Sequence, residues 1–340
     1  MTTSSAKFEP TRSTSNPLSG ARIFLTGGRG FIGSHLVGRL LGRGNTVTVF
    51  DNGRRDALGY TGLDGTAGLT TIVGDVTDRA ALDQAIGDAT YVLHLAAIAG
   101  VSSYYRTPLR TLEVNYGGTQ NLLASLKDRP GVQLMVGFST SEIYGPDARD
   151  AREDGMTSQG SIWDRRWVYA ISKLAAEKLG YAYFWEHGLP ICYIRPFNVY
   201  GPGQVGEGAI SVFIYRALRG LPIEVTGDGQ QVRAFCYIDD FCEAIETCLA
   251  EPDVARGQSF NIGDPREPLT MLDLARRVIA LTGSTSEISF KPHAGEDVRH
   301  RSPSIERAQE RLGYHPSTLL DDGLRRTIQW FREANPAEPA

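Results

Sequence analysis

The stretch FLTGGRGFIGSHL, from Phe24 to Leu36, decides how the first half of the chain folds. Gly27, Gly30 and Gly33 recur at every third position between an apolar run and a helical apolar pattern. Glycine is unfavourable inside a strand or a helix, so this turn needs backbone that another group approaches closely. In a strand-to-helix turn, such glycines permit a tight bend and let a pyrophosphate contact N–H groups at the helix N-terminus. The alternative is an ordinary turn that uses glycine for positive φ.

The segments around this turn alternate between short apolar runs and helical patterns. This spacing predicts a Rossmann-like α/β fold with a doubly wound parallel sheet. After about Gly188 the pattern breaks into Pro- and Gly-punctuated pieces, with helices expected at 208–220 and 271–283. We expect a Rossmann domain over residues 20–190, with a contribution from about 236–263. A smaller C-terminal α/β lobe, formed by 191–235 and 264–335, would bind the substrate.

Composition narrows the class of protein. The chain has 340 residues, 41% of them hydrophobic, and a formal net charge of −4 with scattered basic residues, so neither a nucleic acid nor a membrane surface is expected as a partner. Its four cysteines form no CxxC pair and no metal-ligand pattern, so we expect no metal and reduced thiols in the cytoplasm. There is no apolar run of about 18 residues and no signal peptide. Residues 1–19, rich in Ser, Thr and Pro, read as a disordered tail.

Two acidic residues favour a dinucleotide at the glycine turn. Asp51 ends the apolar run TVTVFD, about twenty residues past the glycines, where a carboxylate can accept hydrogen bonds from the adenosine ribose hydroxyls. NAD is therefore expected over NADP, although Arg54 and Arg55 would suit a 2′-phosphate. In GDVTD (74–78), Asp75 and Val76 are expected at the adenine. The alternative for this segment is a helix N-cap, and both interpretations can hold.

The sequence YAISK places Tyr169 and Lys173 on one face of a helix. A phenol titrates near pH 10, which is too high for a general base, and a nearby ammonium would lower its pKa. The same lysine can hold a nicotinamide ribose. The alternative is a chance spacing, which many helices contain.

A polar triplet follows the apolar run QLMVG. Thr140, Ser141 and Glu142 in FSTSEIYG should lie at the carboxyl edge of the sheet, where open α/β folds bind ligands. Such groups are costly to bury without partners. The alternative is ordinary Ser and Thr turn chemistry.

The motifs TGGRGFIGSHL, DN, GDVTD, HLAA, STSEIYG, YAISK, RPFNVYGPGQ and RLGYHP, in this order, resemble the extended short-chain dehydrogenase/reductases that act on nucleotide sugars. The resemblance covers nearly the whole chain after the tail. It implies that Tyr169 is the base at the sugar C4 hydroxyl, Lys173 its electrostatic partner and Thr140 a hydrogen-bond partner of O4, while NAD takes a hydride from C4. The cofactor contacts that it implies are Gly27, Gly30, Phe31, Ile32, Gly33, Asp51, Asn52, Asp75, Val76, Leu95, Ala96, Ala97, Tyr169 and Lys173.

The same resemblance indicates which residues bind the sugar nucleotide. It implies that Asn198 and Arg233 grip the diphosphate and nucleotide, and that Tyr104 lines the sugar pocket. An exposed charge is the alternative for Arg233, although a guanidinium fork suits a diphosphate. Helices near 111–127 and 168–185 would pair into a homodimer, or else be intramolecular core.

Two features favour decarboxylation within this family. Thr140, Ser141 and Glu142 resemble the triplet of UDP-glucuronic acid decarboxylases, and DVRHRSPSI (297–305) resembles the aminoarabinose-pathway decarboxylase, which makes Arg301 an active-site arginine. Once C4 is a ketone, a uronate is a β-keto acid that can lose CO2. Glu142 would be protonated, or would deliver the proton to C5. The alternative for Arg301 is a phosphate or surface contact.

Other functions remain open from the sequence. A UDP-glucuronate 4-epimerase is the first alternative and a nucleotide-sugar 4,6-dehydratase the second, and an NAD-sensing regulator would keep the dinucleotide turn without chemistry. Decarboxylation itself has two outcomes, since bound NADH would reduce the ketone to UDP-xylose, whereas early release would leave UDP-4-keto-pentose. The polar segment 146–166 is unusually long and could fold as a lid.

Overall fold

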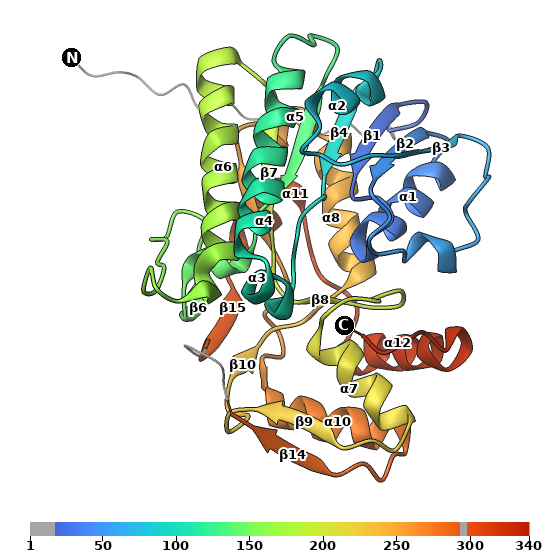
Figure 1. The fold of residues 1–340 in the computed structure, drawn as a ribbon, viewed down its shortest axis with the longest axis vertical. Helices are drawn as coiled ribbons and strands as arrows, with labels where there is room; N and C mark the ends of the chain where they lie inside the picture. The colour runs from blue at the N-terminus through green and yellow to red at the C-terminus, as the bar shows by residue number, and fades with distance from the viewer. Residues whose placement is uncertain (1–17, 293–297, 340) are drawn as a thin grey trace.

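The computed structural model describes residues 18–292 and 298–339, apart from the side chains of Val101 and Tyr104, and its centre is a seven-stranded parallel sheet (Figure 1). The strands lie in the order β12-β7-β5-β4-β1-β2-β3. Their bounds are β1 (Arg22–Thr26), β2 (Thr46–Asp51), β3 (Leu69–Val73), β4 (Tyr91–His94), β5 (Leu134–Phe138), β7 (Ile191–Pro196) and β12 (Ser259–Ile262). The order reverses between β1 and β4, which creates a crevice at the carboxyl ends of these strands. The predicted doubly wound α/β fold is confirmed.

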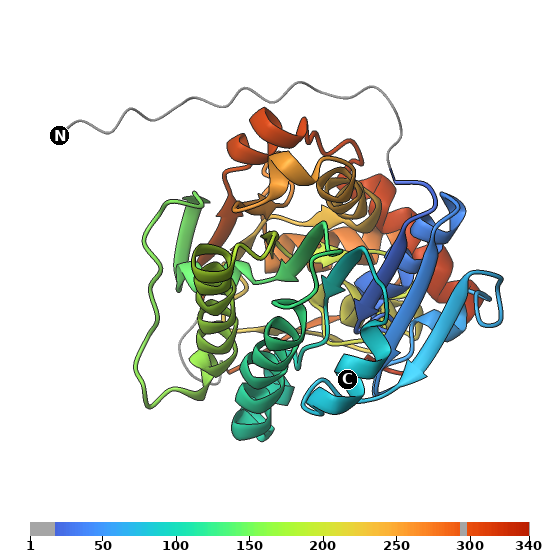
Figure 2. The same cartoon turned by 90° about the horizontal axis from the view of Figure 1, so that it is seen from above.

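Helices cover both faces of this sheet (Figure 2). Side chains alternate along β1, so Ile23 and Leu25 pack into one core and Phe24 into another on the opposite face. The first core includes α1 and α8, and the second includes α2 and α5. The helices of this unit are α1 (Phe31–Gly42), α2 (Arg79–Ile86), α3 (Val101–Arg106), α4 (Pro108–Leu112), α5 (Gly118–Leu126), α6 (Val168–His187), α8 (Ile238–Ala250) and α9 (Pro252–Ala255). Short 3-10 or π turns are η1 (Leu58–Tyr60), η2 (Glu113–Gly117), η3 (Ser141–Tyr144) and η4 (Arg165–Trp167).

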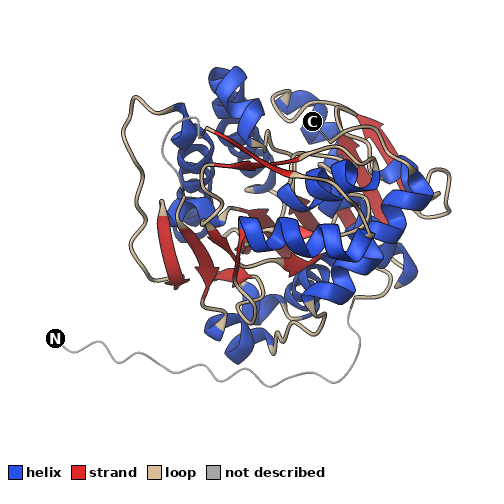
Figure 3. Cartoon of the chain, turned by 90° about the horizontal axis from the view of Figure 1, so that it is seen from below, coloured by secondary structure: helices blue, strands red, loops and turns tan. Residues whose placement is uncertain are grey.

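A second lobe lies at the carboxyl edge of the sheet, and Figure 3 views the molecule from that side. Its largest sheet has the order β13-β10-β15-β6, and β8 pairs with β11 and β9 with β14. The strands are β6 (Asp147–Ala151), β8 (Val199–Tyr200), β9 (Ile223–Thr226), β10 (Val232–Arg233), β11 (Cys236–Tyr237), β13 (Leu269–Thr270), β14 (Ile288–Lys291) and β15 (His300–Pro303). The helices are α7 (Ala209–Leu218), α10 (Met271–Thr282) and α12 (Leu320–Ala334), whereas α11 (Glu306–Leu312) packs against β12, α8 and α9 of the first unit. The helices expected at 208–220 and 271–283 are thus present as α7 and α10.

The lobes exchange strands in a way that differs from the expected boundaries. Residues 191–196, expected in the second lobe, form β7 of the large sheet, because this apolar segment is buried between β5 and β12. Conversely, β6 from the first half of the chain pairs with β15. Leu18, near the end of the expected tail, is buried in the core, whereas residues 1–17 lie outside the described residues.

Three further findings bear on the environment of the protein. Within residues 18–292 and 298–339, no helix combines the length and the apolar character needed to cross a membrane. In the same ranges, no group of three or more His, Cys, Asp or Glu side chains could hold a metal ion. All four cysteines are buried thiols.

Candidate active site

The glycine turn between β1 and α1 is shaped by close contacts. Gly27 has φ +75°, and a Cβ there would lie 2.5 Å from the backbone nitrogen of Ala96. A Cβ on Gly33 would lie 2.4 Å from the carbonyl oxygen of Gly27. Gly30 is the N-cap of α1 and makes no side-chain cap, so the helix N-terminus faces the adjoining cavity with bare backbone. The turn therefore has the geometry that the spacing predicts.

A cavity of about 330 Å³ opens beside this turn at the reversal of strand order. All fourteen residues expected to contact a cofactor line it: Gly27, Gly30, Phe31, Ile32, Gly33, Asp51, Asn52, Asp75, Val76, Leu95, Ala96, Ala97, Tyr169 and Lys173. Ser139 and Gln204 also line it, and the oxygens Oγ of Ser139 and Oε1 of Gln204 are buried without a hydrogen-bond partner among the described residues. Bare helix N–H groups, a carboxylate at the second strand end and unused polar atoms fit a dinucleotide.

The two acidic residues have different surroundings. Asp51 accepts hydrogen bonds from the backbone N–H groups of Arg29 (3.0 Å) and Gly53 (2.8 Å), but burial raises its pKa above the usual value. Burial also acts to raise the pKa of Asp75, yet hydrogen bonds from Thr77 and the charge of Arg110, 2.6 Å away, hold it below the usual value.

The N-cap of α2 is Asp78, whose side chain accepts a hydrogen bond from the backbone of Ala81. The helix N-cap expected within GDVTD is thus confirmed at Asp78, directly before the first residue of α2, while Asp75 of the same segment lies on the cavity wall.

Tyr169 and Lys173 lie one turn apart at the start of α6 and both line the cavity. Burial lowers the pKa of Lys173 to about 8, although Glu177 acts to raise it. Burial and the charge of Glu142 raise the pKa of Tyr169, against the hydrogen bond from Thr140 and the charges of Arg301 and Arg55. The expected lowering of the Tyr169 pKa by Lys173 is not observed, because burial is the largest influence on this phenol and raises its pKa.

Buried polar side chains that the sequence analysis did not single out hold this helix in place. Asn115 lies in the π turn η2 and donates from Nδ2 to the carbonyl of Ile98 (3.1 Å) and to Oγ of Ser172 (3.0 Å). Ser172 in turn donates to the carbonyl of Tyr169 (2.7 Å). His94 is bracketed by the hydroxyls of Thr26 and Thr119, and burial lowers its pKa to about 3. A π turn often marks a functional position, but it leaves no clear signal in sequence.

The polar triplet at the end of β5 meets two arginines. Thr140 caps η3 by accepting a hydrogen bond from the backbone of Glu142 (3.2 Å). Oε1 of Glu142 lies 3.4 Å from Nη1 of Arg301 and 3.5 Å from Nη2 of Arg166. Ser141, Arg166 and Arg301 are buried, and Oε2 of Glu142 has no hydrogen-bond partner among the described residues. Because Arg301 is buried, its side chain is not a surface contact, and the phosphate contact stays the alternative prediction for this residue.

Arg166 was not anticipated from the sequence. It lies in η4, three residues before Tyr169. Its position directly before the helix that carries Tyr169 was the only feature of the sequence that could have indicated a role in the site. Its guanidinium also lies over the ring of Trp167, 5.9 Å from the ring centroid.

The residues expected to bind the nucleotide lie farther along the second lobe. Arg233 pairs in register with Arg301 on the parallel strands β10 and β15, so the two side chains project to the same face. Asn198 has φ +41°, a conformation that asparagine tolerates, and donates to the carbonyl of Ala234 (2.8 Å). Tyr104 belongs to α3, but its side chain lies outside the described residues, as does Asp297 of the 297–305 motif.

The long polar segment 146–166 begins as strand β6 and ends in η4. Between them, Met156, Ile162 and Trp163 are each about 90% exposed. These side chains do not cover the cavity in this structure, so the segment is not seen as a closed lid.

Comparison with known proteins agrees with this geometry. Residues 23–263 match the NAD dependent epimerase/dehydratase family. The chain is 36% identical to a UDP-N-acetyl-alpha-D-glucosaminuronate decarboxylase of Bacillus cytotoxicus, with 92% of this chain and 98% of the relative covered. It is 34% identical to UDP-glucuronic acid decarboxylase 1 of Arabidopsis thaliana, with 92% of this chain and 70% of the relative covered.

Among solved structures, UDP-glucuronic acid 4-epimerase from Bacillus cereus, in complex with UDP-glucuronic acid and NAD, superposes with a TM-score of 0.85. It shares 29% identity and covers 92% of this chain and 99% of its own. The glycine turn, the cavity and the Tyr169–Lys173 helix are thus explained by common descent: the chain belongs to the NAD dependent epimerase/dehydratase family.

Proposed function

We propose that this chain is an NAD-dependent nucleotide-sugar decarboxylase that acts on UDP-glucuronic acid. The observation that carries the proposal is the placement of Glu142 between Arg301 and Arg166, beside Tyr169. Two guanidinium groups against one carboxylate leave a net positive charge, which favours a substrate carboxylate. Relatives named UDP-glucuronic acid decarboxylase, 33–35% identical, support the same substrate.

The residues of the dinucleotide cavity would hold NAD, which supplies the hydride acceptor for C4 and, once reduced, the hydride donor. Gly30 and the start of α1 would receive the pyrophosphate, and Asp51 the adenosine ribose. Lys173 would hold the nicotinamide ribose. The cofactor is assigned as NAD rather than NADP because the negative charge of Asp51 would repel the 2′-phosphate of NADP.

In the first step, Tyr169 takes the proton of the C4 hydroxyl as C4 becomes a ketone. Thr140, which is hydrogen-bonded to Tyr169, orients O4. Once the proton is transferred, the ammonium of Lys173 would stabilise the phenolate, since the two residues lie one turn apart on α6, both line the cavity, and Lys173 is buried.

In the second step, the bond from C5 to the carboxylate breaks and CO2 leaves. The electron pair forms an enolate at O4, where Tyr169 stabilises it by hydrogen bonding, and a proton is then delivered to C5. Arg301 and Arg166 orient the departing carboxylate, and a grip that was too strong would stabilise the ground state. We assign delivery of this proton to Glu142, which takes it up from solvent before each turnover and is left as the carboxylate between the two arginines once C5 is protonated.

The test is product analysis of purified protein with UDP-glucuronic acid and NAD. We expect labelled CO2 from the C6 carboxylate and a UDP-pentose by mass. A UDP-galacturonate peak without CO2 would establish the epimerase alternative instead, and loss of water would indicate the dehydratase. Bound NADH without turnover of any of these would point to a sensor.

A second substrate is favoured by a specific observation. The Bacillus cytotoxicus relative, at 36% identity, is named for UDP-N-acetyl-alpha-D-glucosaminuronate. The same assay with both uronates, compared by kcat/KM, decides between them. The NADH absorbance left after turnover separates release of the 4-keto-pentose from its reduction to UDP-xylose.

We further propose a homodimer formed through α4, η2 and α6. Leu109, Leu112, Tyr116, Ile171 and Trp185 on these elements are all exposed in the single chain. Sedimentation of the full chain would show a monomer if these side chains have no partner copy.

Two further proposals concern the location of the protein and its second lobe. The four buried thiols suit the reducing cytoplasm. The second lobe is proposed to bind the nucleotide sugar.

A further inference from the structure

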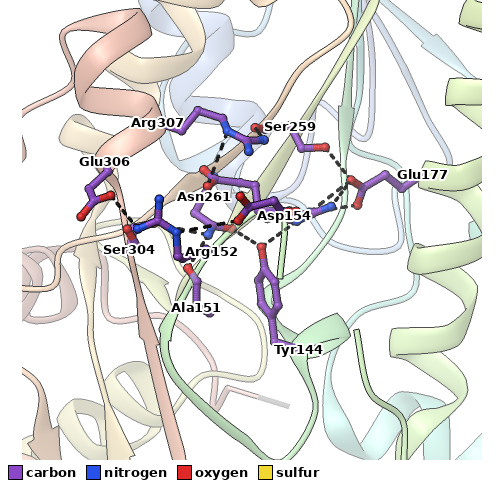
Figure 4. Close-up of polar contacts among 12 residues, drawn as sticks. Tyr144, Ala151, Arg152, Asp154, Glu177, Ser259, Asn261, Ser304, Glu306 and Arg307 are labelled. Atoms are coloured by element: carbon purple, nitrogen blue, oxygen red, sulfur yellow. Dashed lines mark hydrogen bonds and ion pairs between the residues drawn. The ribbon is translucent and has the colours of Figure 1, made fainter. Parts of the chain in front are cut away.

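Figure 4 shows a cluster of polar side chains that includes Tyr144, Glu177 and Asn261, all three of them buried. Its centre is Arg195 of β7, which donates from Nη2 to Oε1 of Glu177 (2.7 Å) and from Nε to both oxygens of that carboxylate. Nη1 of Arg195 donates to the hydroxyl of Tyr144 (2.6 Å). Arg195 and Glu177 are 8% and 2% exposed, so this ion pair is shielded from water.

The cluster continues from Tyr144 into the second lobe. The Tyr144 hydroxyl donates to Oδ1 of Asn261 (2.7 Å). Nδ2 of Asn261 donates to the carbonyl of Ala151 (2.7 Å), at the end of β6, and approaches the carbonyl of Ser304 (3.3 Å), just after β15. We call Glu177, Arg195, Tyr144 and Asn261 the buried relay.

Two relay residues, and one residue that accepts a hydrogen bond from the relay, lie close in sequence to site residues. Glu177 is one helical turn after Lys173 on α6. Tyr144 stands two residues after Glu142 in η3, and Ser304 stands three residues after Arg301. The hydrogen bonds of the relay therefore join the three elements that carry the acid–base pair, the carboxylate and the arginine.

We propose that the buried relay is a positioning device, which fixes Glu142 and Arg301 relative to Tyr169 and Lys173. The inference rests on the proposed function, because it assigns CO2 loss to the first two residues and C4 oxidation to the other two. The relay residues touch neither group of reacting atoms, and act through the turn η3 and the strand β15.

Energetics argue that the relay does more than fill space. An apolar cluster of similar volume would be at least as stabilising, since desolvating an ion pair is costly. Directional hydrogen bonds, in contrast, fix the distance between elements, and a satisfied buried network specifies one arrangement. A misplacement of about 1 Å at reacting groups can cost about 100-fold in rate, so such fixation matters for chemistry.

Tyr144→Phe tests the relay with little loss of packing. The ring would keep its stacking on Phe197 (6.1 Å between centroids) and its place under the Arg195 guanidinium (5.4 Å). Only the hydroxyl, which joins η3 to Arg195 and Asn261, is removed. Tyr181→Phe is the matched control, because the partly buried Tyr181 hydroxyl contacts Ser259 (2.7 Å), which donates to Glu177 (2.6 Å), and does not contact η3.

The measurements are kcat and KM for CO2 release and, in a single turnover, the rates of NADH formation and CO2 release. For Tyr144→Phe we expect kcat to fall about 10- to 100-fold, with KM changed less than about twofold and NADH accumulating before CO2 appears. Tyr181→Phe should retain the wild-type order of events. Asn261→Ala, which cuts the relay at its second joint, should reproduce the Tyr144→Phe pattern and serves if that variant does not fold.

Two results would overturn the proposal. One is wild-type kinetics for Tyr144→Phe and Asn261→Ala. The other is a loss of kcat that is similar in Tyr144→Phe and Tyr181→Phe and that follows the decrease in melting temperature of each variant. That is the behaviour of a cluster with a merely structural role. Failure of the proposed function is distinguished by the wild-type protein itself, which would then release no CO2 from either uronate.

Discussion

Glu142 and Arg301 are separated by 159 positions in sequence, yet Oε1 of Glu142 lies 3.4 Å from Nη1 of Arg301. Pairing of β15 with β6 brings the arginine to the end of β5, where the polar triplet begins. Arg166 approaches the same oxygen at 3.5 Å. One carboxylate thus lies between two cations, and the site has an excess of positive charge next to Tyr169.

Replacing Arg301 tests whether this charge drives CO2 loss. For Arg301→Ala we expect CO2 release to slow about 100- to 1000-fold, the usual effect of removing one preorganised donor from developing charge. Labelled UDP-glucuronic acid measures it. Arg149→Ala, in the exposed arginine of neighbouring β6, is the control and should keep full activity. Equal rates in the two variants would remove Arg301 from the reaction.

Tyr169→Phe tests the acid–base role of the phenol. Removing a positioned general base lowers kcat by about 100- to 10,000-fold. NADH formation in the presence of the sugar nucleotide should fall accordingly, while NAD affinity changes little because the ring remains. Undiminished NADH formation by this variant would contradict the mechanism.

The pKa of Lys173 predicts an alkaline limit to activity. Burial lowers it to about 8 from the ordinary 10.5, so the charged form is lost at a lower pH than for an exposed lysine. His94 faces it from β4 and stays uncharged, because burial lowers its pKa to about 3, and Glu177 on α6 acts to keep the lysine charged.

We therefore expect kcat/KM to decline as pH rises through about 8. Lys173→Arg stays protonated throughout this range and should flatten the decline, even at reduced activity. A decline that persists unchanged in Lys173→Arg would assign the alkaline limit to another group.

Asp51→Ala tests the adenosine ribose site. Hydrogen bonds to a charged group contribute about 1.5–3 kcal/mol, so we expect NAD affinity to fall about 10- to 100-fold in a calorimetric titration. Asp64→Ala, which removes an exposed carboxylate beside Arg29, is the comparison. Should both variants bind NAD as tightly as the wild type, Asp51 would not contact the cofactor.

Glu177→Gln tests the stability of the buried ion pair. The substitution leaves the Arg195 charge buried without its carboxylate, which costs about 3–5 kcal/mol of unfolding free energy. Urea unfolding measures this loss. Glu243→Gln, at an exposed position of α8, should change stability by less than about 0.5 kcal/mol. A similar small change for Glu177→Gln would show that water reaches Arg195.

The sequence alone was sufficient wherever the decisive residues lie within one or two turns of each other. The glycine spacing predicted the turn before α1, the βα alternation predicted the parallel sheet, and the four-residue interval placed Tyr169 and Lys173 on one helical face. Backbone sterics and helical periodicity are local, so they can be read from spacing.

The tertiary structure was needed wherever the partners come from distant segments. It identified Asp78 as the N-cap of α2 within GDVTD, showed that Arg166 lies beside Glu142, and showed that burial raises the pKa of Tyr169. It also showed that the four residues of the buried relay, which come from distant segments, contact one another. Strand order and burial set these contacts and the local dielectric, and neither is encoded in the spacing of any single motif.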